Sequence, residues 1–284
     1  MIQDIAPHRM DIAFANFREG RKCHFLFFYQ GRLLTLGEET AIAFAPVDYT
    51  TPFAGRRQYL FAVDSESYFR IELENVDEYN KLNEELTKAG QAFQWAGRTF
   101  FRKAAPRHLA FAGITAMHLD GWYRQNRRCG VCGGELEPDS RERILRCPKC
   151  GNLVYPRINP AVIVAVTNGE ELLLTKYRDR EYKKYALVAG FVEIGETLEE
   201  TVAREVMEET GLAVKNIRYY KSQPWGFADN LLMGFFCEVD GNTEIHMDRE
   251  ELSVARWVRR SEISVPPEDL SLTNEMICKF CIDK

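Results

Sequence analysis

Two short cysteine pairs constrain the fold of this chain more than any other feature of its sequence. Two residues separate the members of each pair, fourteen lie between the pairs, and a glycine follows each pair; the cysteines are Cys129, Cys132, Cys147 and Cys150. Thiolates at this spacing, with glycines that permit tight turns, can close a tetrahedral zinc site. Four protein ligands leave no open coordination position, so we predict one structural Zn²⁺ per chain. Two disulfides or free thiols are the alternative.

Composition bounds the rest of the chain. Its 284 residues are 45% hydrophobic and 28% charged, enough for a core divided between two domains. The longest apolar run, Ala161 to Val166, is far shorter than the roughly 18 residues of a membrane-spanning helix. The N-terminal residues do not have the pattern of a secretory signal, so we expect a cytoplasmic protein with no membrane partner. In that compartment we expect the cysteines to bind metal rather than to be oxidised.

The other four cysteines lie outside this pattern. Cys23 and Cys237 have apolar neighbours and are expected to be buried, whereas Cys278 and Cys281 fall on a predicted helix and are interpreted as packing residues.

The first hundred residues have the pattern of a mixed domain. His24 to Leu36 is apolar on both sides of Gln30-Gly31, a hairpin signal, and Tyr68 to Leu73 is a strand candidate. Helices are predicted over Asn75 to Ala89 and Pro106 to Gln125.

The second half alternates strand and helix signals. Strands are predicted at Ala161 to Val166, Leu172 to Thr175, Tyr185 to Val192, Ile217 to Tyr220 and Leu231 to Val239. Asn168-Gly169 predicts a tight turn between the first two. Thr197 to Glu200 forms a capping-box pattern for a helix that ends at Gly211, and a last helix is expected over Leu272 to Cys281.

The helix after Thr197 is rich in glutamate. At about 100° per residue, Leu198, Val202 and Val206 form an apolar stripe, and Glu209 falls inside it. Glu205 and Glu208 lie at its edge. Clustered carboxylates that turn inward need compensating cations, and an oxygen-rich site of this kind suits Mg²⁺ or Mn²⁺ bound together with a phosphate substrate. Arg204 points elsewhere on the helix, and we expect it to pair with Glu200.

These residues resemble a known family. Gly190, Glu196, Arg204-Glu205, Glu208-Glu209, Gly211 and Leu212 match every fixed position of the Nudix box, the signature of hydrolases that cleave nucleoside diphosphates linked to another group. The ribbon before the box and Ser222 to Phe227 (SQPWGF) after it resemble the NADH pyrophosphatase branch, over nearly the whole chain but weakly over the first hundred residues. The branch reads SQPWPFPxS; here Gly226, Ala228 and Asn230 replace Pro, Pro and Ser, which leaves substrate preference open.

The resemblance implies a fold and a domain order. The fold class is α/β (α+β): a Nudix α/β/α sandwich with a mixed sheet at 155–284, preceded by a zinc ribbon at 126–154 and an N-terminal mixed α+β domain at 1–125.

The resemblance also implies site residues. Glu205, Glu208 and Glu209 would be catalytic, with Glu205, Glu209, Glu251 and a backbone carbonyl of Ala189 or Gly190 holding Mg²⁺ or Mn²⁺. Tyr155, Trp225 and Phe227 offer aromatic surface for a nicotinamide or adenine ring, although ordinary core packing is the alternative. The remaining substrate-site candidates are Phe191, Gln223, Pro224, Gly226, Ala228, Asp229, Asn230, Glu142 and Thr273; the family usually has Ala at the position of Thr273.

The expected activity is hydrolysis of the pyrophosphate bond of NADH or NAD⁺ to AMP and nicotinamide mononucleotide by a homodimer, with removal of NAD caps from RNA as an extension. A net charge of −5 argues against a general polyanion binder, but residues 126–157 carry a local +3. Two alternatives stay open: a Nudix hydrolase that prefers ADP-ribose or another nucleoside diphosphate derivative, and a non-catalytic binding module.

Overall fold

The computed structural model describes residues 1–14, 22–45, 56–178 and 184–282. Contacts divide the chain into two compact units. The N-terminal unit contains Ile2–Arg157 and Gly226–Ala228, and the C-terminal unit contains Met1, Ile158–Trp225 and Asp229–Lys284. None of the helices in the described ranges is long and apolar enough to cross a membrane.

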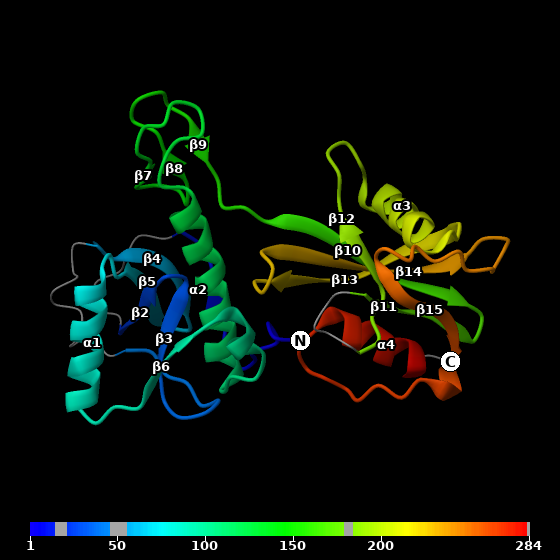
Figure 1. The fold of residues 1–284 in the computed structure, drawn as a ribbon, viewed down its shortest axis with the longest axis horizontal. Coiled ribbons are helices and arrows are strands. Elements are labelled where there is room, and N and C mark those ends of the chain that lie inside the picture. The colour runs from blue at the N-terminus through cyan, green and yellow to red at the C-terminus, as the bar shows by residue number, and fades with distance from the viewer. Residues whose placement is uncertain (15–21, 46–55, 179–183, 283–284) are drawn as a thin grey trace. The chain divides into compact units, whose positions relative to one another are not determined.

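A six-stranded sheet organises the N-terminal unit (Figure 1), in the order β1-β4-β5-β2-β3-β6. Its strands are β1 (Met10–Asp11), β2 (Cys23–Tyr29), β3 (Arg32–Leu36), β4 (Gln58–Val63), β5 (Glu66–Glu72) and β6 (Phe93–Ala96). Strands β2 and β5 are parallel and the other pairs antiparallel. The predicted hairpin is confirmed, because Gln30 and Gly31 both have positive φ between β2 and β3.

Two helices cover this sheet. Helix α1 (Val76–Lys88) begins at Asn75, whose side chain accepts a hydrogen bond from the Glu78 amide, and buries Leu82 and Leu86 against the sheet. Helix α2 (Arg107–Gln125) follows Pro106 and the short helix η2 (Arg98–Arg102). Both long helices confirm their predictions to within a residue.

The zinc-ribbon segment is a small three-stranded sheet of the same unit. Its strands β7 (Glu137–Pro138), β8 (Leu145–Arg146) and β9 (Leu153–Val154) are two residues long each and antiparallel. No hydrophobic pattern signals strands of this length.

A mixed sheet forms the centre of the C-terminal unit. Strands run in the order β13-β14-β10-β11-β15, with β12 also paired to β10, and β10 and β14 are parallel. The strands are β10 (Asn159–Asn168), β11 (Glu171–Tyr177), β12 (Val188–Phe191), β13 (Val214–Trp225), β14 (Asn230–Val239) and β15 (Leu252–Arg259). Of these, β15 was not predicted. Gly169, at φ 58°, makes the predicted turn between β10 and β11.

One helix lies on each face of this sheet (Figure 1). Val202 and Val206 of α3 (Leu198–Thr210) pack with Val162, Val164 and Val166. On the other face α4 (Leu272–Ile282) packs against Ile163 and its neighbours. Alternating residues of β10 therefore supply both cores, and the predicted α/β/α sandwich is confirmed.

Cysteine burial follows expectation in part. Cys237 is buried, Cys278 and Cys281 lie on α4, but Cys23 is only half-buried.

Candidate active site and zinc ribbon

Helix α3 begins and ends as its sequence predicts. Thr197 accepts a hydrogen bond from the Glu200 amide, and the Glu200 carboxylate accepts one from the Thr197 amide, which completes the capping box. Gly211 ends the helix at φ 71°, a conformation that favours glycine. These ends fix which side chains of α3 turn inward.

Three glutamates on α3 differ sharply in burial. Glu209 is 2% exposed, the side chain of Glu205 is 13% exposed and that of Glu208 is 58% exposed. The placement of Glu209 inside the apolar stripe is confirmed, and Glu205 lies at its edge. The helix thus presents a graded set of carboxylates from core to solvent.

Gly190 leaves room for Glu205. A Cβ atom at residue 190 would lie 1.8 Å from the carboxyl carbon of Glu205, so any larger side chain would displace this carboxylate. Gly190 belongs to β12, which pairs with β10. The carboxylate therefore rests directly on strand backbone, beside the residue whose carbonyl was predicted to join a metal shell.

Opposing charges act on the Glu205 carboxyl. Burial raises its pKa most, Arg204 lowers it, and the negative charges of Glu208 and Glu251 raise it further. Glu251 is exposed and immediately precedes β15. The charges of Glu208 and Glu251 therefore oppose ionisation of Glu205.

Arg204 ties the loop before α3 to the helix. Its guanidinium donates two hydrogen bonds to Glu196, of 2.6 and 2.9 Å, one each to Glu205 and Glu208, and one to the Phe191 carbonyl. This bidentate pairing holds the pKa of Glu196 at about 2. The predicted pair with Glu200 is wrong, since that carboxylate is used by the capping box. Sequence reasoning considered only helical neighbours of Arg204, and the presence of Glu196 among the box residues was the signal that could have identified this partner.

The donor set fits a hard divalent cation. Carboxylate oxygens are the ligands that Mg²⁺ and Mn²⁺ prefer, and burying several acids together is costly without a cation. Arg204 compensates part of this charge, at Glu205 and Glu208. Glu209 is the most buried of the set, at 2% exposed. The residues therefore suit the cation that the box implies.

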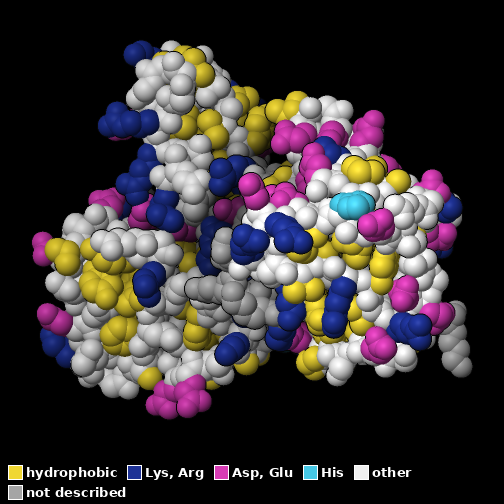
Figure 2. All heavy atoms as spheres, turned by 45° about the vertical axis from the view of Figure 1, so that its right-hand side comes forward, with side chains coloured by type: hydrophobic (Ala, Val, Ile, Leu, Met, Phe, Trp, Pro, Cys, Tyr) yellow, Lys and Arg dark blue, Asp and Glu magenta, His cyan; other side chains and the backbone are white. Residues whose placement is uncertain are grey.

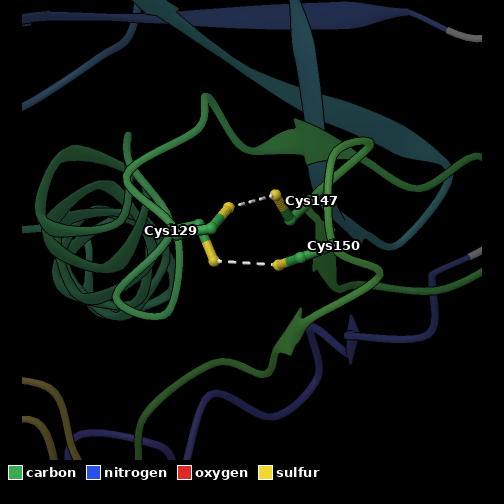
Figure 3. Close-up of side chains that lie close together, drawn as sticks. Cys129, Cys147 and Cys150 are labelled. Atoms are coloured by element: carbon green, nitrogen blue, oxygen red, sulfur yellow. Dashed lines mark hydrogen bonds between the residues drawn. The ribbon is translucent and has the colours of Figure 1, made fainter.

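The four ribbon cysteines converge on one point, and they form a possible metal-binding group of acids, histidines or cysteines within the described residues (Figure 3). Their sulfurs all lie within 4.8 Å of one another, with 3.6 Å between Cys129 and Cys150 and 3.4 Å between Cys132 and Cys147. A tetrahedral zinc with ~2.3 Å bonds places its sulfurs about 3.8 Å apart. The separations of the thiols are therefore close to those of a tetrahedral zinc site.

Backbone amides favour the thiolate form of two of the ribbon cysteines. At the other two, hydrogen bonds with neighbouring thiols outweigh the backbone amides and raise the pKa of Cys132 to about 12 and that of Cys150. Hydrogen bonds from the amides of Val131 and Cys132 lower the pKa of Cys129 to about 6. Backbone amides also lower the pKa of Cys147, with that of Cys150 first among them. Thiolates are the form that binds zinc.

The predicted aromatic contacts differ in exposure. Tyr155 is 60% and Phe191 55% exposed, so neither is a core aromatic, whereas Trp225 is half-buried beside the core of the C-terminal unit. Phe227 is half-buried, with the Arg102 guanidinium 4.6 Å from its ring centre.

The rest of the SQPW segment divides between buried and exposed residues. Gln223 is fully buried; its amide donates to the Leu270 carbonyl and accepts from the Leu272 amide, so it anchors the start of α4. Gly226 and Asn230 are buried, Asp229 is half-buried with φ 58°, and Pro224 and Ala228 are exposed.

Glu142 is exposed between the ribbon cysteines, and Thr273 is half-buried in the first turn of α4. Sequence reasoning missed Tyr177, whose hydroxyl donates a 3.4 Å hydrogen bond to the carbonyl of Ala189, a predicted metal-shell residue.

Two family models match separate segments of the chain. Residues 157–280 match the NUDIX domain, and residues 124–155 match the NADH pyrophosphatase zinc ribbon domain. The chain carries a Nudix domain behind an NADH pyrophosphatase zinc ribbon. The carboxylate cluster therefore belongs to the Nudix domain and the four thiols to the ribbon, as their motifs indicated.

Relatives of this chain are similar to it over part of their length. NAD-capped RNA hydrolase NudC from Pectobacterium carotovorum subsp. carotovorum (strain PC1) is 44% identical over 160 residues, which make up 56% of this chain and 60% of that protein. The protein of the same name from Escherichia coli O1:K1 / APEC is 40% identical over 169 residues, 60% of this chain and 64% of its own length. The matched region thus spans less than two thirds of these relatives.

A crystal structure of a NUDIX hydrolase from Nitrosomonas europaea is also similar. The match is 28% identical and covers 48% of this chain and 80% of that one, with a TM-score of 0.43.

Proposed function

We propose that this protein hydrolyses the pyrophosphate bond of NADH and NAD⁺ in a metal-dependent reaction. One observation carries the proposal: a graded carboxylate cluster on α3 occupies the Nudix box of a chain whose ribbon matches that of NADH pyrophosphatases. The relatives named NAD-capped RNA hydrolases support the same substrate class. The alternative, a non-catalytic binding module, does not explain the clustered glutamates of α3.

In this proposal Glu205, Glu209 and Glu251, with the carbonyl of Ala189 or Gly190, hold Mg²⁺ or Mn²⁺. When bound, the cation neutralises the diphosphate and activates water for attack. The Arg204 clamp fixes the position of Glu205 and of the loop that precedes α3.

The reaction exchanges one bond to phosphorus for another. An oxygen–phosphorus bond forms from water, the bridging oxygen–phosphorus bond breaks, and a carboxylate of Glu205, Glu208 or Glu209 accepts the proton of the attacking water. The products are AMP and nicotinamide mononucleotide.

We propose that nucleotide rings contact exposed Tyr155 and Phe191 together with Trp225 and Phe227. The loop Gln223–Asn230, Glu142 and Thr273 are proposed to contribute to the same site. In the loop, buried Gln223 acts by holding backbone rather than by direct contact.

We further propose three functional modules at 1–125, 126–154 and 155–284, one structural Zn²⁺ per chain, and a homodimer that acts in the cytoplasm. NAD-capped RNA is proposed as a second substrate, because its cap contains the same pyrophosphate bond.

A substrate panel tests the proposal. Purified protein is incubated with Mn²⁺ or Mg²⁺ and NADH, NAD⁺, ADP-ribose or a diadenosine compound, and the products are separated chromatographically. We expect the highest kcat/KM on NADH or NAD⁺, with AMP and nicotinamide mononucleotide in equal amounts. A clear preference for ADP-ribose would instead favour the alternative that the altered SQPW loop leaves open.

A further inference from the structure

Strand β11 is paired on both of its sides near its C-terminal end. On one side it pairs with β15 up to its last residue, Tyr177. On the other side, Thr175 and Ala186 exchange two backbone hydrogen bonds of 2.9 Å just before β12 begins. The end of β11 is therefore connected to the segment that carries Glu251 and to the segment that carries Ala189.

The side chain of Tyr177 reaches a backbone oxygen of β12. It is half-buried, and its hydroxyl donates a 3.4 Å hydrogen bond to the carbonyl of Ala189. A backbone carbonyl has two lone pairs, so this oxygen can accept from the hydroxyl and still offer a lone pair to a cation. The hydroxyl can therefore orient the carbonyl without blocking it.

An irregular register surrounds Tyr177. Lys176 lies opposite Val254 of β15. The next residue, Tyr177, lies opposite Leu252, so the register skips Ser253. The Ser253 hydroxyl donates a 3.1 Å hydrogen bond to the Lys176 carbonyl and fixes the irregularity in place. Irregularities of this kind change the direction of the side chains beside them and often lie next to active sites.

The same strand end holds the backbone of Glu251. The amide of Arg178, the residue after β11, donates a 2.9 Å hydrogen bond to the Glu251 carbonyl. The amide of Asp248 donates another, also of 2.9 Å, to the carbonyl of Glu209 on α3. The turn at residues 248–251 is therefore tied to β11 and to α3 at the same time.

The acids of this region need such support because they repel one another. Figure 2 shows Asp and Glu side chains gathered at the top of the C-terminal unit, where α3 lies in Figure 1. The charges of Glu208 and Glu251 raise the pKa of Glu205, after the larger effect of its burial. A group of ligands keeps a fixed geometry when packing and hydrogen bonds lock the residues that carry it.

We propose that Tyr177 is a positioning residue of the cation site: its hydroxyl holds the Ala189 carbonyl, and the strand end that carries it holds the backbone of Glu251. The inference rests on the proposed function, since Ala189 and Glu251 belong to the cation shell of that proposal. Tyr177 contacts neither cation nor substrate and acts on the affinity for the cation.

Binding of Mn²⁺ alone tests this role without any turnover. Electron paramagnetic resonance of the free ion gives the Kd for the full-length wild type and its variants, and thermal melts check folding. Tyr177→Phe removes one hydroxyl and keeps the ring. Tyr219→Phe is the matched control, since Tyr219 is 58% exposed on β13 of the same sheet. Ser253→Ala loosens the strand end with Tyr177 in place, so it tests the proposal even if Tyr177→Phe is unstable.

We expect Tyr177→Phe to raise the Kd for Mn²⁺ about tenfold, the lower end of the effect of removing a group that bonds a metal ligand. Ser253→Ala should raise it roughly threefold, and Tyr219→Phe should leave it within about twofold of wild type. The Mn²⁺ concentration that gives half-maximal NADH hydrolysis should rise by the same factor as the Kd, and the KM for NADH at saturating Mn²⁺ should not change.

An unchanged Kd in folded Tyr177→Phe would overturn the proposal, even if the Tm were lower, because a merely structural tyrosine would have that effect. An unchanged Kd in Ser253→Ala would overturn it if Tyr177→Phe did not fold, and so would equal weakening by Tyr219→Phe. If Mn²⁺ binding depended on Tyr177 while NADH was not cleaved, only the proposed function would fail.

Discussion

At the scale of single residues, Gly190 and the Glu205 carboxylate share a space that admits no further atom. A methyl group at residue 190 would lie 1.8 Å from the carboxyl carbon. We therefore expect Gly190→Ala to reduce kcat on NADH by roughly a hundredfold, because a metal ligand or its carbonyl neighbour must move.

The matched control is Gly97→Ala, where nothing lies within 4 Å of the added Cβ and φ is not positive. Steady-state kinetics of both variants, with thermal melts to check folding, make the comparison. Equal kcat values for Gly190→Ala and wild type would show that the position of Glu205 does not govern turnover.

Expectations for single residues agreed with the structure where the geometry of one helix determines the burial of a side chain. The burial of Glu209 follows from its place on the apolar stripe of α3. Its 2% exposure agrees with the position expected at about 100° per residue. The partner of Arg204 could not be predicted in this way, because Glu196 lies outside the helix and reaches it through the turn at Gly195.

At the scale of elements, the ribbon strands are too short to be stable without a cross-link. Four convergent thiols provide one, and a zinc bound there contributes directly to folding. We predict that Cys147→Ser lowers the zinc content from about one per chain to nearly none. A loss of ~2 kcal/mol would lower the Tm by roughly 4–8 °C.

Elemental analysis and a thermal melt test this prediction, with Cys237→Ser, a buried cysteine outside the ribbon, as the control for thiol loss. The kcat on NADH should remain within about threefold of wild type in the folded fraction. Wild-type protein without zinc would refute the ribbon assignment.

Elements with strong local signals were predicted well, and weakly patterned ones were not. Helix α1 has an asparagine cap and α3 a capping box, and each follows its signal to within a residue. The strands β7, β8 and β9 are two residues long each, which is too short to show an alternation of apolar and polar residues. Their positions depend on the loops that carry the cysteines. The order of strands, including the parallel pairing of β10 with β14, depends on contacts distant in sequence.

At the scale of the whole molecule, we expect a histidine pair to make stability depend on pH. The rings of His8 and His108 are stacked, with their centres 3.7 Å apart. A hydrogen bond of 2.9 Å joins Nδ1 of His8 to Oδ2 of Asp64. Burial, followed by the charge of His8, lowers the pKa of His108, while Asp64 and Glu66 raise it less.

A folded-state pKa below the unfolded value means that the unfolded chain binds more protons, so stability is lost as the pH falls below about 6.5. We expect the urea concentration at the unfolding midpoint of the wild type to decrease when the pH is lowered from 7.5 to 5.5. The midpoint of His108→Gln should decrease less over the same pH range. His246→Gln, an exposed histidine, is the control. Parallel pH curves for His108→Gln and wild type would contradict this assignment.

The central claim, that the α3 carboxylates carry out metal-dependent hydrolysis, is tested most directly by Glu209→Gln. NADH hydrolysis is measured across a Mn²⁺ titration for wild type, Glu209→Gln and Glu199→Gln, an exposed glutamate on the same helix. We predict that Glu209→Gln loses at least about a hundredfold in kcat/KM at every Mn²⁺ concentration while it stays folded, and that Glu199→Gln matches wild type. Unchanged turnover in folded Glu209→Gln would show that α3 does not form the active site.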